Sequence, residues 1–315
     1  MLFRSVLRLR DQVRKVLIGQ DDIIDQVLAA FLAAGHVLIE GVPGLGKTLL
    51  VKAIAETFSG DFARVQFTPD LMPADVMGHA MFNMKEQEFV IRKGPVFCNM
   101  LLADEINRAP AKVQSALLEA MEERQVTIAG ETRRLESPFF VLATQNPIEL
   151  EGTYPLPEAQ LDRFLLNPVI RYLPEADEIR MVGDTTGLDR PTPEPILTGP
   201  EILILQSLVR QVPAPESVLS YAVRLASASR PGEAGCDPWV ASRIKWGAGS
   251  RGSQALVLCS KARALLEGRP NASREDVRAM AKSALRHRIL PSFLAESEGL
   301  TSDDLIDRLL EQVSE

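Results

Sequence analysis

Apolar residues follow two different patterns along the chain, and the pattern changes near residue 190. Before that point, short apolar runs end abruptly at glycine, proline or polar residues, as at 36–40, 97–103 and 139–144. Such runs are typical of buried strands in a parallel sheet. Behind Pro110, apolar residues instead recur at helical spacing: Val113, Ala116, Leu117, Ala120 and Met121. Strands that alternate with helices predict an α/β core.

Beyond residue 200 the apolar positions keep only the helical spacing. They predict helices over 201–211, 215–229, 251–267, 273–286 and 301–313, and two of these begin with capping boxes, Ser273 with Asp276 and Thr301 with Asp304. A proline-rich segment precedes them and predicts a linker. We therefore predict a core domain over 1–188, a linker over 189–200 and an all-helical domain over 201–315.

Other segments of the core are less regular. Residues 1–34 predict two helices that are broken near Gly19, and the second begins at Asp21 or Asp22. Residues 62–67 predict a strand, and 125–135 a hairpin that turns at Gly130. The methionine-rich stretch 71–94 shows only a short extended piece at 89–91, so it suits either a loosely packed insert or a flexible recognition surface.

The stretch from Gly41 to Thr48 carries the most specific chemical signal. It matches the phosphate-binding pattern G-x-x-x-x-G-K-[ST], between a predicted strand and a predicted helix over 48–58. Glycines let backbone N–H groups approach a triphosphate, Lys47 supplies charge to the β- and γ-phosphates, and the Thr48 hydroxyl can bind Mg²⁺. The predicted nucleotide-binding residues are Gly41, Val42, Pro43, Gly44, Leu45, Gly46, Lys47, Thr48 and Leu49. ATP and Mg²⁺ are the expected ligands.

Polar side chains end two of the predicted strands. Asp104 and Glu105 end the run 97–103, and ligands bind at the carboxyl edge of a parallel sheet. Behind a phosphate-binding loop, Asp104 is predicted to hold Mg²⁺ through water, and Glu105 to orient and deprotonate the attacking water. Asn146 follows the run 139–144, where its amide either polarises the γ-phosphate or attacking water, or caps a turn. Taken alone, Arg163 reads as a surface ion-pair partner.

Composition limits the class of protein and its expected location. The 315 residues, 46% hydrophobic and 24% charged, suit a globular protein with a full core. A net charge of -7 gives no electrostatic case for nucleic acid. Three cysteines without metal-site spacing fit a reduced, cytoplasmic location. No apolar run approaches the ~18 residues of a membrane span, so no membrane insertion is expected, and Asp11 favours an ordinary first helix over a targeting segment.

The longer wording around these motifs resembles the MoxR family of AAA+ ATPases over nearly the whole chain. The phosphate-binding loop occurs in many unrelated families, whereas four longer phrases are specific: QFTPDLMPAD at 66–75, DEINRAPAKVQ at 104–114, ATQNP at 143–147 and EAQLDRF at 158–164. The resemblance implies a five-stranded parallel αβα core followed by a helical lid. It also implies a ring-shaped homo-oligomer, with a hexamer as the expected form and ATP between neighbours.

The resemblance further implies roles for individual residues. Gly19 and Gln20 match the family's segment beside the adenine, Lys47 and Thr48 match Walker A, and Asp104 and Glu105 match Walker B. Asn146 matches sensor 1, Arg163 the arginine finger that contacts a neighbour's γ-phosphate, and Arg251 sensor 2. Residues 71–94 match the helix-2 insert and 125–135 the pre-sensor-1 hairpin.

One position departs from the family's wording. Gly249 and Ser250 precede Arg251 and Gly252 follows it, where the family usually has Ser-Pro before the arginine and Ala after it. The arginine itself is present, so the sensor 2 assignment is kept. Whether Arg251 serves its own ATP or that of a neighbour stays open.

Four functions are compatible with these motifs. Members of the family are chaperone-like ATPases that mature or activate partner proteins, often ones with von Willebrand factor A domains and metal sites, so a protein client is expected. A magnesium-chelatase-type subunit is a close relative of this function. A nucleic-acid motor of the MCM type shares the insert and hairpin, but the tip at 129–131 lacks the usual Lys or Arg. A nucleotide-gated scaffold without turnover is disfavoured by Glu105 and Arg163.

Overall fold

The chain begins with two helices, α1 (Leu2–Val16) and α2 (Asp21–Leu32), with the break between them where the sequence predicts it. The structure is a computed structural model that describes residues 2–41, 44–146, 152–186, 191–233 and 236–313. Two acidic residues, Asp21 and Asp22, occupy the first turn of α2, where they complement the helix dipole. Ile24, Val27 and Leu28 of α2 are fully buried, so this helix forms part of the hydrophobic core.

A parallel sheet lies at the centre of the core domain. It contains β1 (Val37–Glu40), β8 (Phe140–Gln145), β5 (Met100–Asp104) and β2 (Phe62–Gln66), in this spatial order. A fifth segment lies beside β1, because isolated parallel bridges pair Val37 with Leu166 and Glu40 with Val169. The described strands therefore confirm the predicted parallel sheet, with the fifth position filled by this bridged segment.

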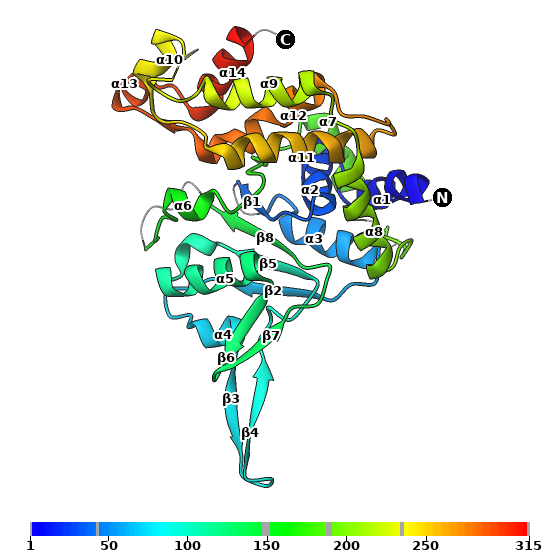
Figure 1. Ribbon diagram of the computed structural model, residues 1–315. Coiled ribbons are helices and arrows are strands. Elements are labelled where there is room, and N and C mark those ends of the chain that lie inside the picture. The colour runs from blue at the N-terminus through cyan, green and yellow to red at the C-terminus, as the bar shows by residue number, and fades with distance from the viewer. Residues whose placement is uncertain (1, 42–43, 147–151, 187–190, 234–235, 314–315) are drawn as a thin grey trace.

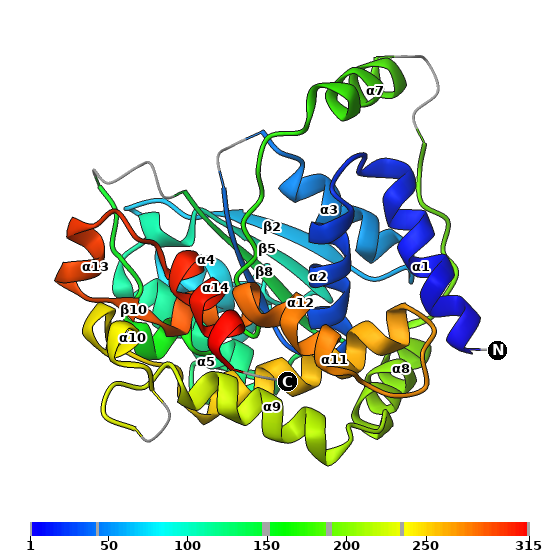
Figure 2. The ribbon, with the colours of Figure 1, turned by 90° about the horizontal axis from the view of Figure 1, so that it is seen from above.

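Helices cover both faces of the sheet, as Figure 2 shows from above. Alternate strand residues point to opposite sides: Val37 and Ile39 join one hydrophobic cluster, whereas Leu38 joins the other. On the first side lie α1, α2 and α3 (Lys47–Glu56), and on the second lie α4 (Pro73–Met77) and α5 (Ala111–Glu123). This arrangement is the predicted αβα core.

Two hairpins extend from the second side of the core. The insert forms α4 and then a ribbon of β3 (Gly78–Asn83) and β4 (Glu88–Lys93), which projects as the long arm at the bottom of Figure 1. The extended piece predicted at 89–91 lies in β4, whereas β3 was not predicted. The predicted hairpin at 125–135 is present as β6 (Gln125–Ile128) and β7 (Glu131–Arg134), with its turn at Gly130.

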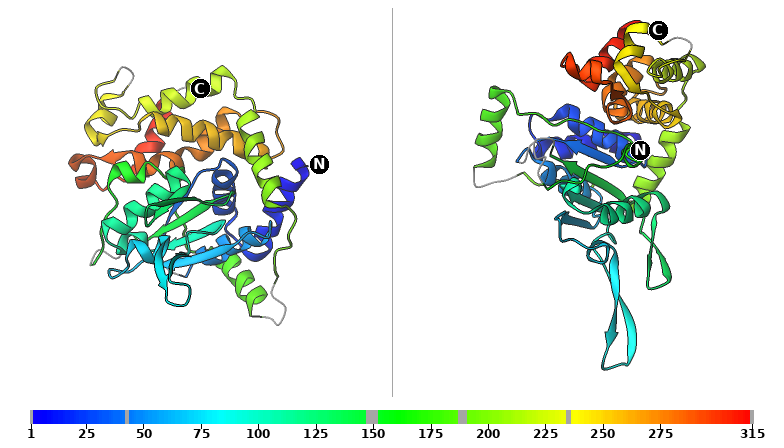
Figure 3. Two further views of the ribbon diagram at one scale, coloured as in Figure 1. Left: turned by 60° about the horizontal axis from the view of Figure 1, so that its bottom comes forward. Right: turned by 90° about the vertical axis from the view of Figure 1, so that its left-hand side faces the viewer.

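The C-terminal part is a helical lid, which lies at the end of the molecule opposite the long hairpin (Figure 3). All five predicted lid helices are present, and both predicted capping boxes form at Ser273 and Thr301. The lid elements are α8 (Gly199–Gln211), α9 (Glu216–Ser227), α10 (Pro238–Arg243), β9 (Ile244–Trp246), α11 (Ser250–Leu266), α12 (Arg274–Leu285), the 3-10 turn η2 (Arg286–Arg288), β10 (Leu290–Pro291), α13 (Phe293–Ser297) and α14 (Ser302–Gln312). The prediction of a purely helical lid misses the short antiparallel pair β9–β10.

Two further helices lie between β8 and the first helix of the lid. α6 (Glu158–Leu161) precedes the bridged segment, and α7 (Glu175–Thr185) projects from the body of the molecule in Figure 2. No described residue of α7 is buried, which explains why no apolar pattern predicted it. The lid is not a separate globule, because α11 packs on α2 and both belong to one hydrophobic cluster. No helix in the described ranges is long and apolar enough to cross a membrane.

Candidate active site

The phosphate-binding loop connects β1 to α3 at the carboxyl edge of the sheet. Gly46 is the N-cap of α3 with a left-handed backbone at φ +82°, a conformation that favours glycine. A Cβ on Gly41 would lie 2.2 Å from Cγ2 of Ile170, so the close approach of the bridged segment also requires glycine there. Val42 and Pro43 lie outside the described residues. The described part of the loop thus leads directly into a helix N-terminus, a site suited to anions.

Lys47, the first residue of α3, is half-buried and folds back over the loop. Its ammonium donates a hydrogen bond to the backbone carbonyl of Gly41 at 2.9 Å. Burial lowers the pKa of Lys47 from its ordinary value, and the negative charges of Asp104 and Glu105 act in the opposite direction. Because β1 and β5 both pair with β8, the loop that carries Lys47 lies at the same edge of the sheet as the two carboxylates. Leu45 and Thr48 are half-buried beside it, and Leu49 is exposed.

One hydroxyl ties the two acidic residues to the neighbouring strand. Thr144 of β8 donates to Oδ1 of Asp104 at 2.6 Å and accepts the backbone N–H of Glu105 at 2.8 Å. Glu105 has φ +57°, so its backbone turns sharply after β5 and its side chain leaves the strand direction. Sequence reasoning did not single out Thr144, because its contacts depend on β8 lying beside β5.

Side chains from β2 and from the turn after β5 contact one further oxygen of each acidic residue. Arg64 forms an ion pair with Oδ2 of Asp104 at 2.7 Å. Gln66 donates to Oε2 of Glu105 at 2.7 Å, and Arg108 reaches the same oxygen at 3.0 Å. The sequence analysis missed all three residues as members of the site. The sequence predicted the strand at 62–67, but it did not show which strand of the sheet would lie beside it. Its side chains could therefore not be assigned to the site.

Asn146 is buried and directly follows β8. The last residue of that strand, Gln145, accepts the backbone N–H of Gly41 at 3.3 Å, so the carboxyl end of β8 lies against the phosphate-binding loop. Gly19 and Gln20 lie elsewhere along the edge and line a cavity of about 1170 Å³ with Tyr172 and other residues. Gln20 donates to the carbonyl of Arg171 at 3.2 Å.

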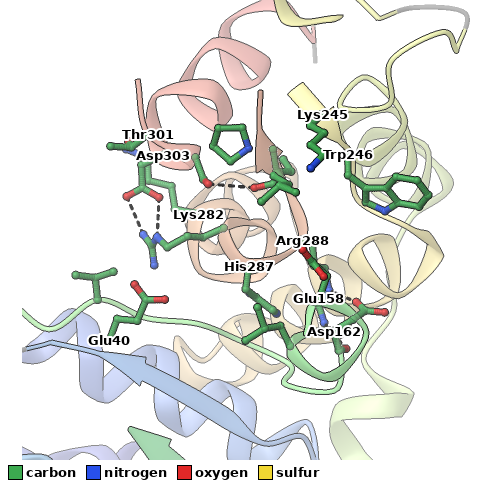
Figure 4. Close-up of a pocket in the computed structure, with 18 of the residues that line it drawn as sticks. Glu40, Glu158, Asp162, Lys245, Trp246, Lys282, His287, Arg288, Thr301 and Asp303 are labelled. Atoms are coloured by element: carbon green, nitrogen blue, oxygen red, sulfur yellow. Dashed lines mark hydrogen bonds and ion pairs between the residues drawn. The ribbon is translucent and has the colours of Figure 1, made fainter. Parts of the chain in front are cut away.

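A second cavity, of about 1190 Å³, lies between the core and the lid. Glu40 and Gln145, at the ends of β1 and β8, line its core side, and Trp246 and Lys282 line its lid side. Figure 4 shows Glu158 and Asp162 next to the lid residues Arg288 and His287 at one side of this cavity, where Nε of Arg288 donates to Asp162 at 2.6 Å. Because Glu40 immediately precedes Gly41, the cavity adjoins the phosphate-binding loop.

The structure brings Arg163 and Arg251 together, although they are 88 residues apart in the sequence (251 − 163). Both form ion pairs with Glu122, near the end of α5. Within the described part of the chain, none of their recorded polar contacts is with Lys47, Thr48, Asp104 or Glu105. The acidic partner Glu122 was not predicted from the sequence.

The donor set fits magnesium. Mg²⁺ prefers oxygen ligands and commonly takes one or two protein side chains, with phosphates and water completing its octahedron. The Asp104 carboxylate and the Thr48 hydroxyl are such ligands. Among the described residues there is no cluster of three or more His, Cys, Asp or Glu that would bind a metal ion without help from a substrate.

A parallel αβα sheet, a phosphate-binding loop, an acidic pair at the next strand end and a helical lid together define an ATPase of the AAA+ class. A family model for the ATPase family associated with various cellular activities matches residues 36–166, and one for the AAA lid domain matches 237–309.

Similar proteins identify the family within that class. The chain is 42% identical to Chaperone MoxR1 of Mycobacterium tuberculosis (strain ATCC 25618 / H37Rv), across 96% of this chain and 80% of that protein. It is 32% identical to Protein MoxR of Methylorubrum extorquens, across 90% and 87%. A crystal structure of an ATPase candidate from Cytophaga hutchinsonii ATCC 33406 superposes with a TM-score of 0.92 and 41% identity, across 99% and 95%. The chain belongs to the MoxR family of AAA+ ATPases.

Proposed function

We propose that the site hydrolyses Mg²⁺-bound ATP with Glu105 as the residue that orients and deprotonates the attacking water. The observation that supports this most directly is that β1, β8 and β5 are adjacent parallel strands, so the phosphate-binding loop after β1 and the acidic pair Asp104 and Glu105 lie at the same edge of the sheet. Lys47 and the loop glycines bind the phosphates, and Thr48 and Asp104 hold the metal ion. Bound magnesium neutralises charge on the phosphate oxygens. Asn146 directs its amide to the γ-phosphate or the water.

Glu105 has to leave its present partners before it can act as a base. Gln66 and Arg108 both donate to Oε2 of Glu105, so this oxygen already has two hydrogen-bond donors where the attacking water would have to bind. Likewise Arg64 neutralises Asp104, where the metal ion would bind. We infer that the structure represents the resting arrangement of the site, and that nucleotide binding exchanges these side-chain partners for metal and water.

We propose further that Arg163 and Arg251 serve the nucleotide of a neighbouring subunit in a ring, with a hexamer as the expected form. Their ion pairs join them to Glu122 instead of to their own Walker residues. In such a ring, an ATP site has all of its catalytic groups only when two subunits are in contact. We propose that Gly19 and Gln20, which line a cavity on the core, contact the adenine.

The function that we propose for the assembly is a cytoplasmic, chaperone-like remodelling of a protein client, of the kind that carries a von Willebrand factor A domain and a metal site. Chaperone MoxR1 is the similar protein whose name points this way. The β3–β4 hairpin supports contact with a client, because Met84 and Phe89 near its end are 85% and 75% exposed. The tip at 129–131 carries no basic residue, so we expect no nucleic-acid substrate.

The chemical part of the proposal is tested by two variants that separate binding from hydrolysis. Glu105→Gln removes the base but leaves the phosphate contacts, so it should bind a fluorescent ATP analogue normally and lose nearly all turnover. Lys47→Ala removes charge from the phosphates and should weaken binding itself. Near-normal turnover of Glu105→Gln would exclude Glu105 as the base, and normal binding by Lys47→Ala would exclude its phosphate contact.

A further inference from the structure

Two arginines from different parts of the fold share one carboxylate. Arg163 follows α6 in the core, and Arg251 is the second residue of α11 in the lid. Nε of Arg163 lies 3.3 Å from Oε2 of Glu122, and Nη2 of Arg251 lies 3.0 Å from Oε1 of the same residue. Each oxygen of Glu122 therefore holds one guanidinium group.

The surroundings leave these two guanidinium groups available to a further anion. Asp162 lies 3.8 Å from Nη1 of Arg251, but its main partner is Arg288, whose Nε donates to it at 2.6 Å. Arg288 is almost completely buried and also donates to backbone carbonyls, so it is committed to the fold. Arg163, which also donates to the carbonyl of Leu118 at 3.1 Å, and Arg251 are 36% and 47% exposed and share Glu122 as a carboxylate partner at the surface.

A shared carboxylate lowers the energetic cost of holding two arginine side chains next to each other. Two neighbouring guanidinium groups repel each other, and each long side chain loses rotamer freedom when it is fixed in one place. Glu122 offsets the repulsion and restricts both side chains before any ligand arrives. An arginine has five N–H donors, so a guanidinium group that gives one of them to Glu122 retains others for phosphate oxygens.

We propose that Glu122 is a positioning residue that holds Arg163 and Arg251 as a two-arginine unit for the polyphosphate of a neighbouring subunit's nucleotide. The proposal rests on the proposed function, in which both arginines act in trans. It adds that the core and the lid present their arginines jointly, because Glu122 belongs to the core helix α5 whereas Arg251 belongs to the lid. The competing reading is an ordinary surface ion pair, which contributes little to any property.

The test compares variants of the full-length protein at this position. Glu122→Ala should lower kcat roughly 10- to 100-fold, since misplacing a catalytic group by about 1 Å has an effect of that order. Binding of a fluorescent ATP analogue should change little, because the Walker residues are intact. Glu122→Asp should recover part of the activity, and Glu122→Gln should not, because an amide offers only one acceptor oxygen to two arginines. Glu123→Ala is the matched control, since Glu123 forms none of the ion pairs recorded for the described residues.

The readouts separate positioning from stability. A structural role would lower the melting temperature of Glu122→Ala, and mixing that variant with Glu105→Gln chains would not restore turnover. A positioning role leaves the melting temperature close to that of Glu123→Ala, and turnover rises on mixing because the defects lie on opposite sides of an interface. If Glu122→Ala keeps its kcat while Arg163→Ala is inactive, the positioning role of Glu122 is excluded, and the trans role of Arg163 is retained. Full activity of Arg163→Ala would overturn the proposed trans role as well.

Discussion

At the scale of single residues, Thr144 illustrates how the sheet prepares the site for chemistry. Its hydroxyl donates to Asp104 and accepts the backbone N–H of Glu105. Thr144→Val keeps the shape of the side chain but leaves that N–H without its acceptor and Oδ1 of Asp104 without the Thr144 hydroxyl. Leaving a buried donor unpaired costs about 1–3 kcal/mol, so we expect a lower melting temperature together with reduced kcat.

Both quantities are measurable on one preparation, by thermal unfolding and by phosphate release. Thr127→Val is the matched control, because the Thr127 side chain is exposed on β6 and its hydroxyl contacts the hydroxyl of Thr132, away from the acidic pair. A Thr144→Val protein with the kcat of the control would show that this hydroxyl does not organise the acidic pair.

The residues that the sequence predicts and those that it misses differ in one physical respect. Lys47, Asp104 and Glu105 belong to contiguous motifs, so their types and spacing were readable without a structure. Thr144 and Glu122 act through contacts with segments far along the chain, and those contacts depend on which strands and helices become neighbours. Spacing along the sequence contains no such information.

At the scale of elements, the β3–β4 hairpin is the least typical feature of the fold. Phe82 and Phe89 pair across the two strands with ring centroids 5.3 Å apart, yet they are 49% and 75% exposed. Replacing both by serine should leave the melting temperature nearly unchanged, because neither belongs to a core cluster. It should reduce fluorescence of a dye that binds exposed apolar surface. Glu86→Ser, in the turn of the same hairpin, is the control, and equal dye fluorescence in the two proteins would refute an accessible apolar surface.

Elements with one buried face were predictable, and elements without one were not. The helix at 111–123 and the lid helices bury a regular apolar stripe, so periodicity identified them. α7 has no buried described residue, and α10 and α13 are only 6 and 5 residues long. β3 was missed because exposed apolar residues occur on both faces of its ribbon, which removes the alternation that marks a half-buried strand.

At the scale of the whole molecule, the core and the lid are in contact where the two arginines proposed to act in trans are located. α11 carries Arg251 at its start, packs on α2, and shares a hydrophobic cluster with α1, α2 and α3. The helix that follows the phosphate-binding loop is therefore part of the same packed unit as the lid.

The assembly itself is tested by mixing two inactive chains. An arginine that acts in trans neutralises charge developing in the transition state, and such residues are worth roughly 10³–10⁵ in rate in GTPases. Arg163→Ala should therefore bind ATP and lose nearly all turnover, as should Glu105→Gln. In a mixed ring, some interfaces join an intact Arg163 to an intact Glu105, and these interfaces should hydrolyse ATP. With random assembly at equal amounts, about a quarter of the interfaces are of this kind (one half times one half), and the rate should be highest at that ratio.

Co-assembly has to be demonstrated separately, for example by pulling down one tagged chain with the other. If the chains co-assemble and turnover stays at the level of either variant alone, Arg163 does not act across an interface. It would then be a surface partner of Glu122 and Leu118, whose carboxylate and backbone carbonyl it contacts. The arginine that completes the neighbouring site would have to be sought elsewhere, and Arg251, held by the same glutamate, would be examined next with the same mixing experiment.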